Sequence, residues 1–166
     1  MSFSKHYQMV KEFHAAFDQP VDMPYTTWHA ERSTHRDVLY KEEADEFVAA
    51  LEANDTLEML DAIVDRMYIA VGTLVELESS ETTYHLIHTW YGKYAQCLKD
   101  AQTHLPGVDV NAAFEEVHRS NMAKLVDGKP LLNGINMDFD DRKPHGKVMK
   151  PEGWQPPKLD VFVKAS

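Results

Sequence analysis

The sequence predicts an all-α fold, a helical bundle of about five helices followed by an irregular C-terminal tail. From Tyr25 to Leu105 there is no proline and there are only two glycines. Because proline breaks a helix interior and glycine weakens it, this stretch favours long helices. None of it alternates strictly between apolar and polar residues, as a half-buried strand would. Residues 127–166 hold four of the seven glycines and five of the eight prolines, which predicts an extended tail.

The first helix is expected over residues 4–17, where Val10, Phe13 and Phe17 share one side, and it ends before Pro20. The second is expected over residues 34–51, with Thr34 as its N-cap.

Three further helices follow along the chain. They are expected over residues 55–77, 80–103 and 109–126. Pro106 and Gly107 separate the last two, and Asp109 is a good N-cap for the final helix. The chain shows no repeat and no low-complexity segment. Its 166 residues predict one domain, with residues 1–126 as the bundle and residues 127–166 as a tail of the same domain.

Composition excludes several classes of function. Asp and Glu outnumber Lys and Arg by 27 to 17, and a surface of that sign repels nucleic acid polymers. The single cysteine, Cys97, cannot form an intrachain disulfide, which fits a reducing, cytoplasmic environment. The first residues lead into no apolar signal core, and the apolar run Met67–Val75 is too short to span a bilayer. We therefore expect a soluble cytoplasmic protein without a membrane partner.

Acidic residues gather on the second and third expected helices. Glu42, Glu43 and Glu46 fall within an arc of about 100° at the helical repeat. The stripe formed by Leu39, Glu43, Glu46 and Ala50 has apolar residues at both ends, which predicts that it turns inward.

Glu58, Asp61 and Asp65 form a second stripe, about 60° wide, on a helix that is otherwise apolar nearly all round. Such a helix belongs in the interior, so its carboxylates are expected to be buried as well. Buried carboxylates must be paired, protonated or bound to metal, and the nearby Lys41 and Arg66 are too few to neutralise them. A hard divalent cation, Mg²⁺ or else Mn²⁺, resolves the imbalance.

Each of these acids also has a simpler interpretation. A glutamate-rich run is usually a solvated helix face. Glu58 lies three residues after Asp55, where it would complete a capping box. The metal interpretation depends on the joint pattern of two adjacent helices.

The pattern Glu42-Glu43-x-x-Glu46, followed twelve residues later by Glu58-x-x-Asp61, resembles a known signature. It is the EExxE…ExxD motif of the all-α nucleoside triphosphate pyrophosphohydrolases, a superfamily that includes MazG, dimeric dUTPases and phosphoribosyl-ATP pyrophosphohydrolase. The resemblance covers most of the chain and is weakest over residues 79–104. It also includes residues 13–17, 61–73, 117–125 and 146–157, and the last two segments are similar to MazG-like members.

The resemblance implies Mg²⁺-dependent hydrolysis of a nucleoside triphosphate to the monophosphate and pyrophosphate. It implies that Glu43, Glu46, Glu58 and Asp61 are metal ligands. Glu42 is either a further ligand or the residue that orients and deprotonates the attacking water, so all five acids are catalytic residues.

The resemblance also implies residues that bind the substrate. Lys124 would contact phosphate, and Asn121, on the same helix face, would bond to sugar, base or phosphate. Asp65 would lie beside the ligands or face the substrate, and His14 would lie in a base pocket. Arg119 and Lys147 are weaker phosphate candidates. A homodimer or homotetramer is expected, since the apolar third helix has more sides than one bundle readily covers.

The base and sugar of the nucleotide are left open by these motifs. We favour a house-cleaning role on non-standard or excess nucleotides over dedicated phosphoribosyl-ATP hydrolysis. Two other classes remain as alternatives. One is a ferritin-like di-metal bundle, for which Glu115-x-x-His118 supplies one of the two motifs needed. The other is a non-enzymatic helical bundle that binds a protein partner, for instance through Trp154 in the tail.

Overall fold

The computed structural model describes residues 2–143 and 145–164, and it confirms an all-α bundle. The predicted tail includes residues 144, 165 and 166, which lie outside the described residues. The five long helices are α1 (Ser2–Ala16), α3 (Ser33–Ala53), α4 (Thr56–Glu76), α5 (Tyr84–His104) and α6 (Val110–Met122). Two short helices are added to them, α2 (Tyr25–Glu31) and α7 (Asp160–Val163). The sequence did not predict either short helix.

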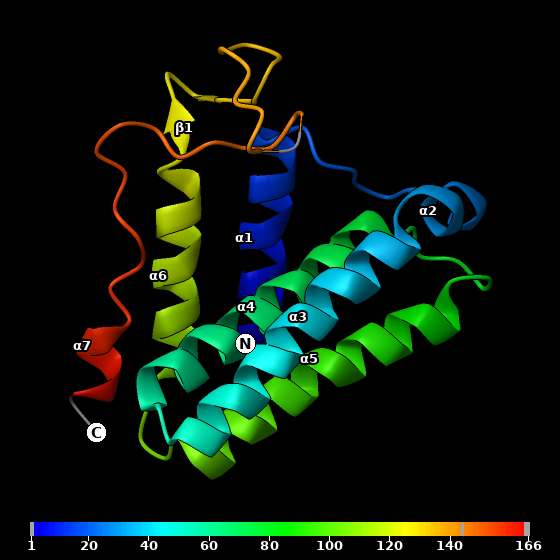
Figure 1. Ribbon diagram of the computed structural model, residues 1–166. Coiled ribbons are helices and arrows are strands. Elements are labelled where there is room, and N and C mark those ends of the chain that lie inside the picture. The colour runs from blue at the N-terminus through cyan, green and yellow to red at the C-terminus, as the bar shows by residue number, and fades with distance from the viewer. Residues whose placement is uncertain (1, 144, 165–166) are drawn as a thin grey trace.

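Helix α4 is the centre of the molecule. It packs against α1, α3, α5 and α6, and most of its side chains are buried. Helices α3, α4 and α5 lie side by side, while α1 and α6 stand next to each other across them (Figure 1). The prediction of a buried, nearly all-apolar helix is therefore confirmed. The chain itself buries most of α4, contrary to the expectation that one bundle would not readily cover it.

Helices α3 and α4 are consecutive and closely packed, as the short link between them requires. Asn54 ends α3 in the left-handed conformation, with φ 55°. Asp55 then caps α4, since its side chain accepts hydrogen bonds from the backbone N–H groups of Leu57 and Glu58. This turn places the early residues of α4 beside the later residues of α3.

The capping predictions have mixed outcomes. Asp109 caps α6 as predicted, by accepting hydrogen bonds from the N–H groups of Asn111 and Ala112. Thr34 does not cap α3, because the helix already begins at Ser33, after Arg32.

The last predicted helix ends earlier than expected, at Met122 instead of residue 126. Leu125–Val126 (β1) pairs antiparallel with Lys129–Pro130 (β2). The turn between them has positive φ at both Asp127 and Gly128, which matches the preference of a tight hairpin for Asp-Gly. The tail then crosses the top of α1 and α6 and descends along α6 to α7 (Figure 1). Leu159, just before α7, joins the main core.

Candidate active site

Six carboxylates from two helices form what we call the acidic cluster. Its members are Glu42, Glu43 and Glu46 of α3 and Glu58, Asp61 and Asp65 of α4. Glu43, Asp61 and Asp65 are half-buried, whereas the other three are exposed.

The predicted inward stripe of α3 therefore needs correction. The face of α3 that packs inward carries Arg36, Glu43, Phe47 and Ala50, of which all but the half-buried Glu43 are buried. Glu46 lies at the margin of that contact, because it comes one residue before Phe47 and so points about 100° away from it. The exposure of Glu46 keeps its carboxylate accessible to a ligand.

The carboxylates interact electrostatically across the two helices. Burial raises the pKa of Glu43 to about 7, and the charges of Glu46, Asp61 and Glu42 add to this effect. Burial also raises the pKa of Asp61, together with the charges of Glu58 and Glu46.

Asp65 shows the largest effect within the cluster. Burial raises the pKa of Asp65 to about 8, and the charges of Asp61 and Glu43 act in the same direction. The positive charge of Lys124 opposes this rise. Crowded carboxylates with raised pKa values are typical of sites that bind a cation or act in proton transfer.

The two nearby basic side chains, Lys41 and Arg66, form ion pairs with acids outside the cluster. Lys41 forms an ion pair with Asp45, its neighbour one helical turn away. The Arg66 guanidinium donates to Asp100 of α5, at 3.0 Å, and lies over the Phe47 ring, at 4.2 Å. Arg66 still lowers the pKa of Glu43, but only as a minor contribution. The cluster thus retains an excess of negative charge.

The donor set of the cluster fits a hard divalent cation. Carboxylate oxygens are the ligands that Mg²⁺ and Mn²⁺ prefer, and the uncompensated charge favours binding. Within the described residues, however, no group of three or more His, Cys, Asp or Glu side chains already lies in position to hold a metal ion. The ligands predicted from the sequence, Glu42, Glu43, Glu46, Glu58 and Asp61, would therefore have to rotate toward a common point.

Two cavities open onto the cluster. A cavity of about 320 Å³ separates α4 from the tail, and its lining residues are Leu57, Glu58, Asp61, Pro156, Pro157, Leu159 and Asp160. A second cavity, of about 420 Å³, lies at the α3–α4 turn and is lined by Glu46, Ala49, Ala50, Ala53, Asp55 and Glu58. Both volumes are in the range of small-molecule sites, and both combine apolar walls with carboxylates of the cluster.

Lys124 lies beside the cluster, as its effect on Asp65 shows. Its ammonium group donates to the side-chain oxygen of Asn121, at 2.7 Å. Asn121 also interacts with the Tyr68 hydroxyl of α4. The structure therefore brings together Asp65, Asn121 and Lys124. Arg119, by contrast, forms an ion pair with Glu116, at 2.6 Å.

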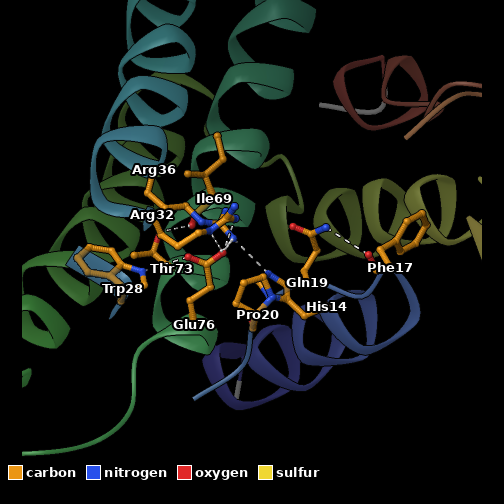
Figure 2. Close-up of polar contacts among 10 residues, drawn as sticks. All are labelled: His14, Phe17, Gln19, Pro20, Trp28, Arg32, Arg36, Ile69, Thr73 and Glu76. Atoms are coloured by element: carbon orange, nitrogen blue, oxygen red, sulfur yellow. Dashed lines mark hydrogen bonds and ion pairs between the residues drawn. The ribbon is translucent and has the colours of Figure 1, made fainter. Parts of the chain in front are cut away.

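His14 occupies a different part of the molecule. Only 2% of its surface is exposed, and its Nδ1 lies 2.7 Å from the carbonyl oxygen of Pro20. Nδ1 must therefore donate, so Nε2 is the acceptor that faces Arg36, at 3.4 Å (Figure 2). These contacts are structural. The role of His14 in base recognition stays a prediction.

The sequence did not reveal the buried network to which His14 belongs (Figure 2). At its centre is Glu76, with 0% exposure. Glu76 accepts hydrogen bonds from Trp28, at 3.1 Å, from Arg32, at 2.6 Å, and from Arg36. Trp28, Arg32 and Arg36 recur at intervals of four residues, and this spacing is the signal that could have identified them.

The di-metal alternative finds no support at its one motif. Glu115 forms an ion pair with Lys5. His118 instead faces Tyr68, 3.0 Å away, and Glu12, 3.6 Å away. The two side chains thus serve separate contacts between helices.

Among the described residues, no helix is long and apolar enough to cross a membrane.

Part of the chain matches a known protein family. Residues 10–80 match the family model described as phosphoribosyl-ATP pyrophosphohydrolase. The matched segment runs from α1 through α4 and contains the whole acidic cluster, but not Lys124 or the tail. Searches of curated proteins and of solved structures gave no match.

Proposed function

We propose that this chain hydrolyses a nucleoside triphosphate to the monophosphate and pyrophosphate. The premise is that residues 10–80 form a domain of the MazG-like all-α nucleoside triphosphate pyrophosphohydrolase superfamily. The observation that carries the proposal is the acidic cluster. It joins two helices of the matched segment, keeps an excess of negative charge and opens onto two cavities.

A divalent cation, Mg²⁺ or Mn²⁺, completes the proposed site. Glu43, Glu46, Glu58 and Asp61 would hold it, and Glu42 would be either a fifth ligand or the residue that orients the attacking water. Bound there, the cation would supply a Lewis acid that polarises phosphate oxygens and lowers the pKa of a water molecule. An acidic protein needs such a cation, because its carboxylates would otherwise repel the polyphosphate.

The remaining residues have roles around the scissile bond. Glu42, if it is not a ligand, orients the attacking water and accepts its proton. Attack then occurs in line at the α-phosphorus, and pyrophosphate leaves. Lys124 stabilises the negative charge of the phosphates, and Asn121 fixes its ammonium group. Asp65 interacts electrostatically with Lys124.

We infer that the substrates are non-standard or excess nucleotides. Phosphoribosyl-ATP is the second candidate, because the matching family model carries that description. Both are hydrolysed between the α- and β-phosphates, so the same site chemistry serves either substrate.

The test is turnover of a nucleotide panel with Mg²⁺ or Mn²⁺. The panel should include standard and oxidised deoxynucleotides, dUTP, dCTP and phosphoribosyl-ATP, with separate detection of pyrophosphate and orthophosphate. We expect pyrophosphate and a monophosphate in equal amounts. Release of orthophosphate would refute attack at the α-phosphorus, and a di-metal protein would bind iron without turning over any nucleotide.

A further inference from the structure

We propose that Lys150, positioned by Trp154 of the C-terminal tail, is a second polyphosphate-binding residue that acts together with Lys124. This inference rests on the proposed function, because it assigns a further substrate contact to the same site. It extends that site beyond the segment that the family model matches, which ends at residue 80.

The geometry brings two ammonium groups to one aromatic ring. The Nζ atom of Lys124 lies 5.4 Å from the centroid of the Trp154 ring, and the Nζ atom of Lys150 lies 4.4 Å from it. Both distances are within the range of cation–π interactions. Residues that are 26 positions apart in the sequence therefore present their charges in one place.

The Trp154 ring is held firmly enough to position them. Its Nε1–H donates to the backbone carbonyl of Ser120 on α6, at 2.8 Å. The Ser120 hydroxyl donates in return to the carbonyl of Gln155, at 3.0 Å. A turn directs the ring toward α6, since the Trp154 N–H donates to Pro151 and Gly153 has φ 77°, a conformation that favours glycine.

Lys124 connects this pair of lysines to the acidic cluster. Lys124 and Asp65 interact electrostatically, and Asp65 interacts with Asp61 and Glu43. Burial lowers the pKa of Lys124, and the like charge of the nearby Lys150 lowers it further. A polyanion that contacts both lysines would relieve this repulsion. Lys150 remains exposed, so it can reach a ligand.

The experiment uses inorganic tripolyphosphate, which carries the phosphate chain but no base or sugar. Its dissociation constant with Mg²⁺ is measured by calorimetry, and the KM and kcat for the best nucleotide are measured alongside. For Lys150→Met we expect binding of tripolyphosphate about tenfold weaker and a similar rise in KM, the scale of one charge-assisted hydrogen bond. Lys150→Arg should restore both values. Lys99→Met, which removes an exposed lysine on α5, is the matched control and should change neither.

Trp154→Phe tests the positioning role. If the ring holds Lys150 in place, Lys150→Met should change tripolyphosphate binding very little when it is added to Trp154→Leu. Added to Trp154→Phe, which keeps an aromatic ring, Lys150→Met should keep most of its effect on binding. Thermal unfolding of each variant checks that the tail remains docked.

The two proposals fail in different ways. If the wild type turns over no nucleotide, the proposed function fails, while weaker tripolyphosphate binding by Lys150→Met than by Lys99→Met still supports the phosphate-binding role of Lys150. If the wild type is active and Lys150→Met behaves like Lys99→Met, then Lys150 only packs on the Trp154 ring and this inference is overturned.

Discussion

Asp61 is the residue through which the two halves of the acidic cluster interact. Its carboxyl group interacts with Glu58 on its own helix and with Glu46 on α3, and its charge raises the pKa of both Glu43 and Asp65. Each of these interactions is repulsive when the groups are ionised. Without a cation, Asp61 therefore destabilises the folded state.

This repulsion predicts how Asp61→Asn changes stability. In metal-free buffer we expect the melting temperature to stay unchanged or to rise, because a negative charge is removed. Added Mg²⁺ should raise the melting temperature of the wild type, since the ion binds only the folded site, and the variant should lose most of that rise. Differential scanning fluorimetry with and without Mg²⁺ measures both effects. A full Mg²⁺ response in Asp61→Asn would remove Asp61 from the ligand set.

At the scale of elements, the hydrogen bonds of Glu76 with Trp28, Arg32 and Arg36 connect α4 to α2 and α3. Burial alone would raise the pKa of Glu76, but hydrogen bonds and charge from Arg36 and Arg32 lower it instead. Glu76 lies eleven residues beyond Asp65, which is about 16 Å along the helix. The network therefore fixes the far end of the α3–α4 pair and leaves the acidic cluster free for chemistry.

Removal of Glu76 should destabilise the fold strongly. Glu76→Ala leaves the buried Arg36 and the half-buried Arg32 without their carboxylate, a loss of about 3–5 kcal/mol in the free energy of unfolding. Glu76→Gln keeps a hydrogen-bond acceptor and should lose less. Urea unfolding measures these values, with Glu81→Ala, an exposed glutamate in the following loop, as the control. A loss below 1 kcal/mol for Glu76→Ala, on the order of an exposed ion pair, would contradict the structural role.

The long elements could be predicted from sequence because their signals are local. The absence of proline, the apolar α4 and the caps at Asp55 and Asp109 each depend on a few neighbouring residues. Helix α2 was missed because it is short and depends on contacts of Trp28 with Glu76, 48 residues away. The contact of Lys150 with Trp154 and Lys124 was missed for a related reason, since the irregular tail has no periodicity that predicts which surface it covers.

At the scale of the whole molecule, buried histidines link stability to pH. Burial lowers the pKa of His6 and of His14 to about 4 from an ordinary value of 6.5. The unfolded chain therefore takes up protons at higher pH than the folded chain does. Their contribution to stability is complete above pH 6.5 and is lost as the pH falls toward 4. The raised pKa values of Glu43 and Asp65 act in the opposite direction, because they favour folding as the pH falls from about 8.

The variant His14→Asn separates the contribution of His14 from that of the carboxylates. His14→Asn keeps a side-chain donor for the Pro20 carbonyl but cannot be protonated in this range. Between pH 7.5 and pH 5.5, we expect the free energy of unfolding of the wild type to change by about 1 kcal/mol more in the destabilising direction than that of His14→Asn. Urea unfolding at the two pH values measures the difference. Equal changes would show that His14 is not held neutral.

The oligomeric state stays a prediction that rests on the family resemblance. Two large apolar side chains on α3, Val38 and Val48, are about half exposed, at 49% and 51%, which offers a surface for a second copy. Sedimentation equilibrium should give at least twice the chain mass of 19.0 kDa. A mass equal to that of one chain at working concentration would contradict the prediction.

The most direct test of the acidic cluster as the catalytic site compares neighbouring acids on α3. Pyrophosphate release from the best nucleotide is measured for the wild type, Glu46→Gln and Asp45→Asn at saturating Mg²⁺. Asp45 is the matched control, since it is an exposed acid that precedes Glu46 and pairs with Lys41 outside the cluster. We predict that Glu46→Gln lowers kcat by a factor on the order of 100 or more, as the loss of a group that stabilises transition-state charge does, while Asp45→Asn stays near wild type. Full activity in Glu46→Gln would mean that these carboxylates are only a solvated helix face, and would contradict the proposed function.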